Sequence, residues 1–124
     1  MLANTANVIS TSPCLLSTVA YRILSDAPVY AIEGSIANAG SAFIWLRDKM
    51  KIIDEFDQID IFCNQTEICD DLLFIPAFSG LFSPFWKEKT KASISGMSLN
   101  TTKEDFCRAL VEGICFQVKA VKKR

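Results

Sequence analysis

A chain of 124 residues with 13 basic and 14 acidic side chains has the material of one domain, and its formal charge of −1 provides no general attraction for nucleic acid or an acidic membrane surface. Half of the residues are hydrophobic, which favours a folded globular chain over a disordered one. The longest apolar run, residues 72–82, is broken by Pro76 and Gly80 and is shorter than the roughly twenty residues that span a bilayer. We therefore expect no nucleic-acid partner and no membrane insertion.

The residue types present also limit the chemistry. No histidine occurs, which excludes the usual general base and the Ser-His and Cys-His nucleophile pairs. The cysteines are odd in number and form no Cys-x-x-Cys pair, so we expect reduced and mostly buried thiols in a cytoplasmic protein. The N-terminus lacks the basic region of a secretory signal, which agrees with that compartment. The five cysteines are Cys14, Cys63, Cys69, Cys107 and Cys115.

The first part of the chain is predicted to form strands. Residues 1–7 have weak strand character, and residues 8–12 and 15–23 alternate apolar with polar side chains. A further strand is expected over residues 29–33 because of its apolar and β-branched residues. Strands that follow one another in this way predict a meander.

A helix is expected to follow the last of these strands directly, from Ser35 to Met50. Ser35 is the predicted N-cap, and Gly34 allows the chain to bend there without a side-chain clash. Residues 37–42 are nearly all small, so they would expose backbone N–H groups at the positive end of the helix. This pattern is typical either of a tight packing joint or of part of a phosphate or nucleotide site, and spacing alone favours packing.

The next segment, residues 51–71, combines scattered carboxylates with apolar side chains. It predicts one or two short surface helices. The carboxylates lack the spaced order of a calcium loop, so we assign no metal site to them and expect a solvated helix face. They are Asp54, Glu55, Asp57, Asp60, Glu67, Asp70 and Asp71.

Two strands, an aromatic loop and a long helix are expected in the remainder. Residues 72–75 are continuously apolar, as in a strand buried on both faces, and residues 92–97 form a second strand. Residues 77–86 are rich in aromatics, glycine and proline, so we expect them to pack against something, such as a missing partner domain. The helix spans residues 101–122.

Two features of that helix are specific. A capping box can start at Thr101 with Glu104 or at Thr102 with Asp105. Gly113 lies inside the helix, where glycine costs about 1 kcal/mol relative to alanine. It therefore indicates a close contact with another helix or a strand.

Four blocks of this sequence, in the right order, resemble the FGGY family of carbohydrate kinases, and within it the glycerol kinases. The family shows an Asn-Thr turn before a Leu-Leu-Thr-Thr strand, and then Ala-Leu-Glu-Gly-Ser, Ala-Gly and Trp-Leu-Arg-Asp blocks. It continues with Pro-Ala-Phe-Ser-Gly-Leu, Pro-Tyr-Trp and a second signature. The corresponding segments here are residues 4–21, 30–48, 76–86 and 93–112.

The resemblance implies an α/β fold, namely a partial actin-like (ribonuclease H-like) ATPase domain with a mixed sheet and flanking helices. It implies that residues 1–124 are part of the C-terminal, nucleotide-binding domain and that the N-terminal domain is absent. The implied activity is phosphorylation of glycerol to glycerol 3-phosphate with ATP and Mg²⁺. The implied partners are glycerol, ATP, and either further copies of the chain or the missing domain.

The resemblance transfers one nucleotide contact by position, Gly40, whose lack of a side chain would let the nucleotide approach the backbone. No catalytic residue and no metal ligand transfer with it. Ile44 stands where the family has a glutamine before its Trp-Leu-Arg-Asp block, and Lys87 stands where it has an aspartate after Pro-Tyr-Trp. We expect the chain alone to be incomplete as an enzyme; the alternatives are an inactive binding or assembly module and a gene fragment that does not fold alone.

Overall fold

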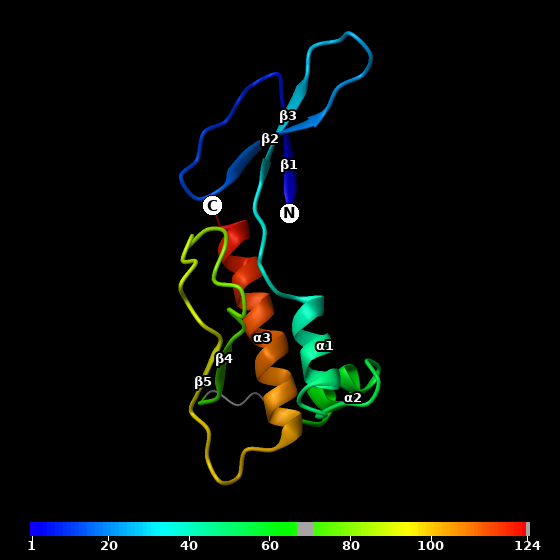
Figure 1. The fold of residues 1–124 in the computed structure, drawn as a ribbon, viewed down its shortest axis with the longest axis vertical. Coiled ribbons are helices and arrows are strands. Elements are labelled where there is room, and N and C mark those ends of the chain that lie inside the picture. The colour runs from blue at the N-terminus through cyan, green and yellow to red at the C-terminus, as the bar shows by residue number, and fades with distance from the viewer. Residues whose placement is uncertain (67–70, 124) are drawn as a thin grey trace.

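The structure, a computed structural model, describes residues 1–66 and 71–123. The expectations for Glu67, Cys69 and Asp70 therefore lie outside the described residues. Five strands and three helices follow one another along the chain (Figure 1). They are β1 (Leu2–Ala6), β2 (Leu16–Tyr21), β3 (Val29–Glu33), α1 (Gly40–Asp48), α2 (Gln58–Gln65), β4 (Leu73–Ile75), β5 (Ser93–Ser95) and α3 (Lys103–Lys122).

The first three strands form an antiparallel sheet in the order β1-β3-β2, so the predicted meander is wrong. β3 lies in the middle and pairs with both other strands, which makes β1 and β2 point the same way. Two strands of the same direction cannot be joined by a tight hairpin. Residues 8–12, predicted as a strand, instead form part of the irregular connection between β1 and β2.

The helices and the small β4-β5 sheet gather at the other end of the molecule (Figure 1). β4 and β5 are antiparallel, with Phe74 opposite Ile94. α3 runs beside β4, and α2 packs on α3. The apolar side chains buried between these elements form the core. It consists of Ala42, Leu46, Ile53, Phe62, Leu72, Phe74, Phe106, Cys107, Ala109 and Leu110.

α3 confirms both specific expectations for the last helix. Its N-cap is Thr102, whose hydroxyl accepts from the Asp105 N–H while the Asp105 carboxylate accepts from the Thr102 N–H, so the second of the two capping boxes is the one formed. Gly113 lies against β4, where a Cβ would collide with the carbonyl oxygen of Phe74 and lie 3.1 Å from Pro76 Cδ. The interior glycine therefore allows the close helix-strand contact.

Arg108 fastens α2 to α3. Its Nη1 donates to the carbonyl oxygens of Cys63, at 2.7 Å, and Thr66, at 2.6 Å, at the end of α2. Its Nε donates to Glu112 at 2.9 Å, one turn along α3. The carbonyls left free at the end of α2 are thereby satisfied by a cation, which also suits the negative end of that helix.

Two burial expectations fail. The segment 72–75 is not buried on both faces: Leu72 and Phe74 are buried, but the alternate residues Leu73 and Ile75 are exposed. The described cysteines are free, but they are not mostly buried. Cys107 is the one among them that is buried, and Cys115 is exposed. Eight residues of helix turn by about 80° beyond two full revolutions, which carries Cys115 off the core face that Cys107 occupies.

In the parts of the chain that the structure describes, no helix has the length and apolar character needed to cross a membrane.

Candidate functional site

The joint between the sheet and the helices is Gly34. A Cβ on this residue would collide with the Val121 side chain of α3 and come within 2.9 Å of Leu15 Cδ2, so glycine is needed for close packing. Its N–H donates to the Met1 carbonyl at 2.9 Å, and its carbonyl accepts from the Met1 ammonium at 2.7 Å. These contacts hold the chain beside β1 as it leaves β3.

The helix predicted to start at Ser35 begins five residues later, at Gly40, so Ser35 as its N-cap is wrong. Residues 34–39 form a non-helical connection. The bonds at Gly34 continue the pairing of β3 with β1, and this keeps the chain from turning into a helix there. The small residues up to Ala39 therefore lead to the helix instead of forming its first turn.

Asn38 positions the start of α1, and sequence reasoning did not single it out. The side chain is buried; its Nδ2 donates to Ser41 Oγ at 3.0 Å, and its Oδ1 accepts from the Ser79 N–H, also at 3.0 Å. It thus joins the beginning of the helix to the aromatic loop 77–86. An asparagine in a run of small residues was the available signal, because a buried amide requires partners of this kind.

Gly40 occupies the first position of α1 and is exposed. A Cβ at Gly40 would meet no atom within 4 Å, so the space beside its backbone is open. The N-cap, Ala39, has no side chain that could accept from the first N–H groups of the helix. These groups and the helix dipole can therefore face an anionic ligand at this end.

Ile44 lies one helical turn after Gly40 and is also exposed. The two positions belong to one outward-facing stripe of α1, because residues four apart on a helix are neighbours. Ile44 offers this stripe an apolar surface and no hydrogen-bonding group.

In the Trp-Leu-Arg-Asp block that follows Ile44, the first two residues have a structural role. Leu46 is fully buried, and the Trp45 ring lies 4.8 Å from the ring of Phe78 and 6.1 Å from that of Phe74. This packing links α1 to β4 and to the aromatic loop. The face of α1 opposite Gly40 is consequently fixed in the core.

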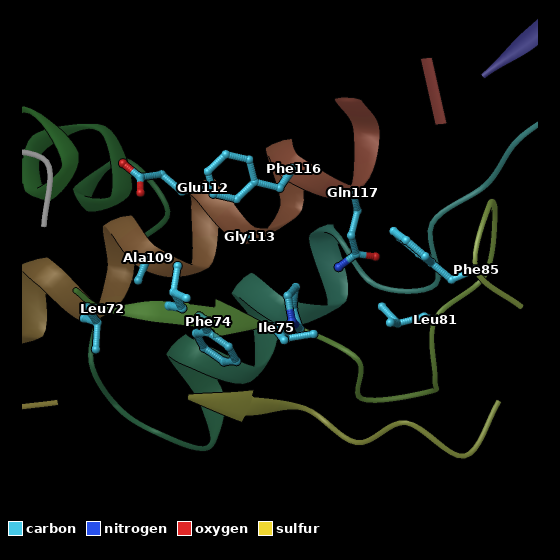
Figure 2. Close-up of a pocket in the computed structure, with 12 residues that line it drawn as sticks. Leu72, Phe74, Ile75, Leu81, Phe85, Ala109, Glu112, Gly113, Phe116 and Gln117 are labelled. Atoms are coloured by element: carbon cyan, nitrogen blue, oxygen red, sulfur yellow. The ribbon is translucent and has the colours of Figure 1, made fainter. Parts of the chain in front are cut away.

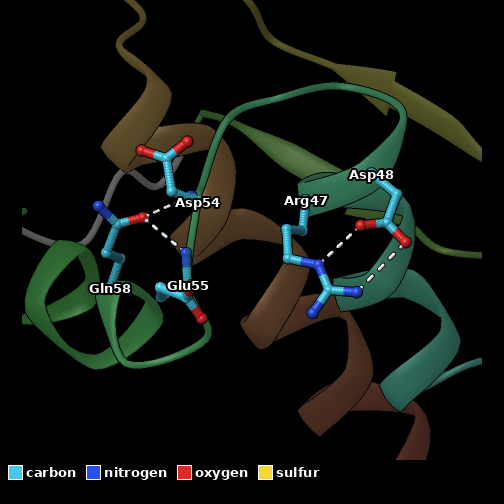
Figure 3. A network of polar contacts seen from close by, with 5 residues as sticks. All are labelled: Arg47, Asp48, Asp54, Glu55 and Gln58. Atoms are coloured by element: carbon cyan, nitrogen blue, oxygen red, sulfur yellow. Dashed lines mark hydrogen bonds and ion pairs between the residues drawn. The ribbon is translucent and has the colours of Figure 1, made fainter.

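Arg47 and Asp48 form an ion pair on the surface (Figure 3). Arg47 Nε lies 2.7 Å from Asp48 Oδ1, and the guanidinium group is 4.5 Å from the ring centre of Phe56. The hydrogen bond and charge of Arg47 hold the pKa of Asp48 below its usual range. Nearby, Gln58 Oε1 accepts from the N–H groups of Asp54 and Glu55, which closes the turn before α2 (Figure 3).

These carboxylates do not converge on a cation. Within residues 1–66 and 71–123, no group of three or more Cys, Asp or Glu side chains is placed to hold a metal ion. The described residues therefore do not fit a Mg²⁺ site of their own.

Lys87 lies at the base of the aromatic loop, where its backbone and that of Leu81 exchange two hydrogen bonds, of 2.8 and 3.0 Å. Gly80 inside this loop has φ +88°, and a Cβ there would lie 2.7 Å from the Glu88 carbonyl oxygen. Trp86 Nε1 donates to the Cys14 carbonyl at 3.2 Å. The loop is thus anchored partly on the chain's own N-terminal segment. Phe82, Phe85 and Trp86 nevertheless remain exposed, so the expected packing of the loop is only partial.

The model of the "FGGY family of carbohydrate kinases, C-terminal domain" matches residues 1–124. The chain belongs to this family. The resemblance found in the four sequence blocks is therefore confirmed, and so is the α/β class, part of the actin-like ATPase fold of FGGY kinases.

Similar proteins within the family include glycerol kinases. The glycerol kinase of Mycobacteroides abscessus is 42% identical over 122 residues, which are 98% of this chain and 24% of that protein. The Plasmodium falciparum glycerol kinase, crystallised with ADP, is 40% identical with a TM-score of 0.85, over 98% of this chain and 24% of that one. The gluconate kinase of Lactobacillus acidophilus shares the fold, at 21% identity and a TM-score of 0.74, over 98% of this chain and 24% of that chain. The chain thus spans about a quarter of the length of these relatives.

Proposed function

We propose that this chain provides part of the nucleotide-binding domain of a glycerol kinase, in which Gly40 at the start of α1 lies against the bound nucleotide. The parent reaction is transfer of the γ-phosphoryl group of ATP, with Mg²⁺, to glycerol, giving glycerol 3-phosphate and ADP. Such transfer depends on positioning and on neutralising charge around the phosphates. In this proposal the chain by itself binds nucleotide but does not catalyse phosphoryl transfer to glycerol.

The observation that carries the proposal is the similarity to a glycerol kinase crystallised with ADP, at 40% identity over 98% of this chain. The geometry at Gly40 agrees with it, because the backbone there is exposed and beside open space. The described cysteines are all free, which agrees with a reducing compartment, and we place the activity in the cytoplasm.

One observation favours a second function, an inactive binding or assembly module. Ile44 is exposed on the stripe that begins at Gly40, and it cannot supply the hydrogen bond of the glutamine that the family carries there. A missing hydrogen bond of this kind typically weakens binding by about tenfold.

Calorimetry with ADP tests the nucleotide site. We expect measurable heat of binding, loss of binding in Gly40→Trp because the indole fills the space beside the backbone, and tighter binding in Ile44→Gln. Ser98→Ala, in a loop remote in sequence from α1, serves as the matched control and should bind as the parent chain does. Equal affinity in the chain and in Gly40→Trp would contradict the assignment of Gly40.

A second measurement tests whether the chain is incomplete as an enzyme. The chain is incubated with ATP, Mg²⁺ and glycerol, and glycerol 3-phosphate is measured against a blank without protein. We expect no product from the chain alone. Clear product formation would refute the expectation that the chain alone is incomplete as an enzyme. If the chain melts cooperatively but does not bind ADP, the inactive module is favoured.

A further inference from the structure

Two thiols meet where α2 packs on α3. Cys107 lies on α3 with its side chain fully buried. It belongs to the same core as Phe62, which precedes Cys63 on α2. The side chains of Cys63 and Cys107 form a hydrogen bond with each other. Two cysteines that are far apart in the sequence are therefore in contact in the folded chain.

The backbone beside this pair is fixed. Arg108, the residue after Cys107, donates from Nη1 to the carbonyl oxygen of Cys63 at 2.7 Å and to that of Thr66 at 2.6 Å. Its Nε donates to Glu112 at 2.9 Å, on the next turn of α3. The end of α2 is thus held against the turn of α3 that carries Cys107. A disulfide tolerates little variation in the separation of its two Cα atoms, so a fixed contact of this kind favours its formation.

The two cysteines differ in exposure, which sets the order in which they can react. Cys63 is partly exposed, whereas Cys107 is completely buried. A small oxidant dissolved in water can therefore reach Cys63 first. Burial raises the pKa of Cys63, but the positive charge of Arg108 opposes that rise and so favours the reactive thiolate.

We propose that Cys63 and Cys107 form an oxidative modification site, at which hydrogen peroxide converts the two thiols to a disulfide that joins α2 to α3. The Cys63 thiolate attacks one peroxide oxygen and the O–O bond breaks, so Cys63 becomes a sulfenic acid and hydroxide leaves. The Cys107 sulfur then attacks the Cys63 sulfur, the S–O bond breaks, and the Cys107 proton leaves with the hydroxyl group as water. In total the two thiols are oxidised to one disulfide, and one peroxide is reduced to two waters.

The cross-link closes residues 63–107 into a covalent loop that contains β4, the aromatic loop and β5. It restricts the unfolded chain, while in the folded chain the two thiols are already together, so it stabilises the fold. The oxidised chain should melt about 10 °C higher than the reduced chain. Buried thiols react slowly, so the pair stays reduced in a reducing compartment and closes when peroxide is abundant. This inference does not depend on nucleotide binding at Gly40.

Peptide mapping tests the proposal. The reduced chain is treated with hydrogen peroxide without denaturant, its remaining thiols are blocked, and it is digested with a glutamate-specific protease. Cleavage after Glu67 separates Cys63 from Cys69. We expect mass spectrometry to find residues 56–67 linked to residues 105–112, with two hydrogen atoms fewer than the separate peptides. Reduction should release both.

Two variants connect the link to the stability of the chain. Cys63→Ser, at the partly exposed position, should form no such link, and peroxide should not raise its melting temperature. Cys115→Ser, at an exposed cysteine, is the matched control and should keep both the link and the rise. Melting of the reduced Cys63→Ser chain shows that this variant is folded.

Several results would overturn the proposal. One is that both thiols stay free after peroxide treatment, and another is that Cys63 becomes a sulfinic acid while Cys107 stays free. Pairing of Cys63 with Cys69 or with a second chain would also contradict it. A linked chain that melts no higher than the reduced chain would show that the cross-link does not fit the fold.

Discussion

Cys107 lies fully buried between α2 and α3, next to the Cys63 thiol. Burial, and then the charge of Cys63 and the hydrogen bond with it, raise the pKa of Cys107 to about 12. Burial likewise raises the pKa of Cys63. Both thiols are thus held in the neutral form, which makes them packing residues and poor nucleophiles.

The raised pKa of Cys107 predicts a loss of stability in alkali. The unfolded thiol ionises near its ordinary pKa of 9.0, whereas the folded one keeps its proton to about 12, so the free energy of unfolding should fall as pH rises between these values. The slope is at most about 1.4 kcal/mol per pH unit. Urea unfolding between pH 8 and 11 measures it.

Cys107→Ala should reduce this slope, and its stability near neutral pH should be lower than that of the parent chain, since the alanine leaves a cavity. Exposed Cys115→Ala is the matched control and should keep the slope of the parent chain. A slope unchanged in Cys107→Ala would refute the assignment to this thiol.

At the scale of the element, α3 was predicted best and α1 less well. α3 has a capping box, a long amphipathic repeat and an interior glycine with a packing role, and each of these signals is local in sequence. The start of α1 instead depends on Met1, which bonds to Gly34, and on Ser79, which bonds to Asn38. Contacts so distant in the chain leave no local pattern, so Ser35 was mistaken for the cap.

The capping box of α3 gives a prediction with an internal control. Asp105→Ala should lower the free energy of unfolding by about 1 kcal/mol relative to the parent chain, since it removes the acceptor of the Thr102 N–H and hydroxyl. Glu104→Ala removes an acidic group from the same first turn without disturbing the box. Chemical denaturation of both variants separates the box from the helix dipole, and equal losses would show that the box contributes nothing.

For the whole molecule, the two ends differ in how well they are packed. Among the described residues of the β1-β3-β2 sheet, Ala31 has the one buried side chain, while Leu16, Val19 and Tyr21 are about half exposed. The helical end holds the continuous apolar core. Stability therefore should be unevenly distributed, because regions with few buried apolar contacts open most readily.

Hydrogen exchange measured by mass spectrometry tests this distribution. We expect peptides from residues 16–33 to exchange faster than peptides from residues 106–121, apart from intrinsic differences between the sequences. Equal protection of both regions would show that the sheet and the helices unfold as one unit.

The family, the fold class and most of the elements could be predicted from the sequence, whereas the strand order and the exposed face of β4 could not. Strand order depends on which partners β3 finds across the long connection after β1. The exposed face of β4 depends on which apolar residues remain uncovered, such as Leu73 beside buried Leu72. Hydrophobicity alone does not distinguish a covered residue from an uncovered one.

The Asn38 side chain has a mechanical consequence. Through Ser41 and Ser79 it fastens the beginning of α1 to the same loop that contributes Leu81 and Phe85 to the wall of the apolar cavity between β4 and α3 (Figure 2). A ligand that shifts the start of α1 would therefore pull on that wall, and a molecule bound in the cavity would in turn restrain α1. Because thermodynamic coupling is reciprocal, nucleotide binding and occupancy of the cavity would each change the affinity of the other by the same factor.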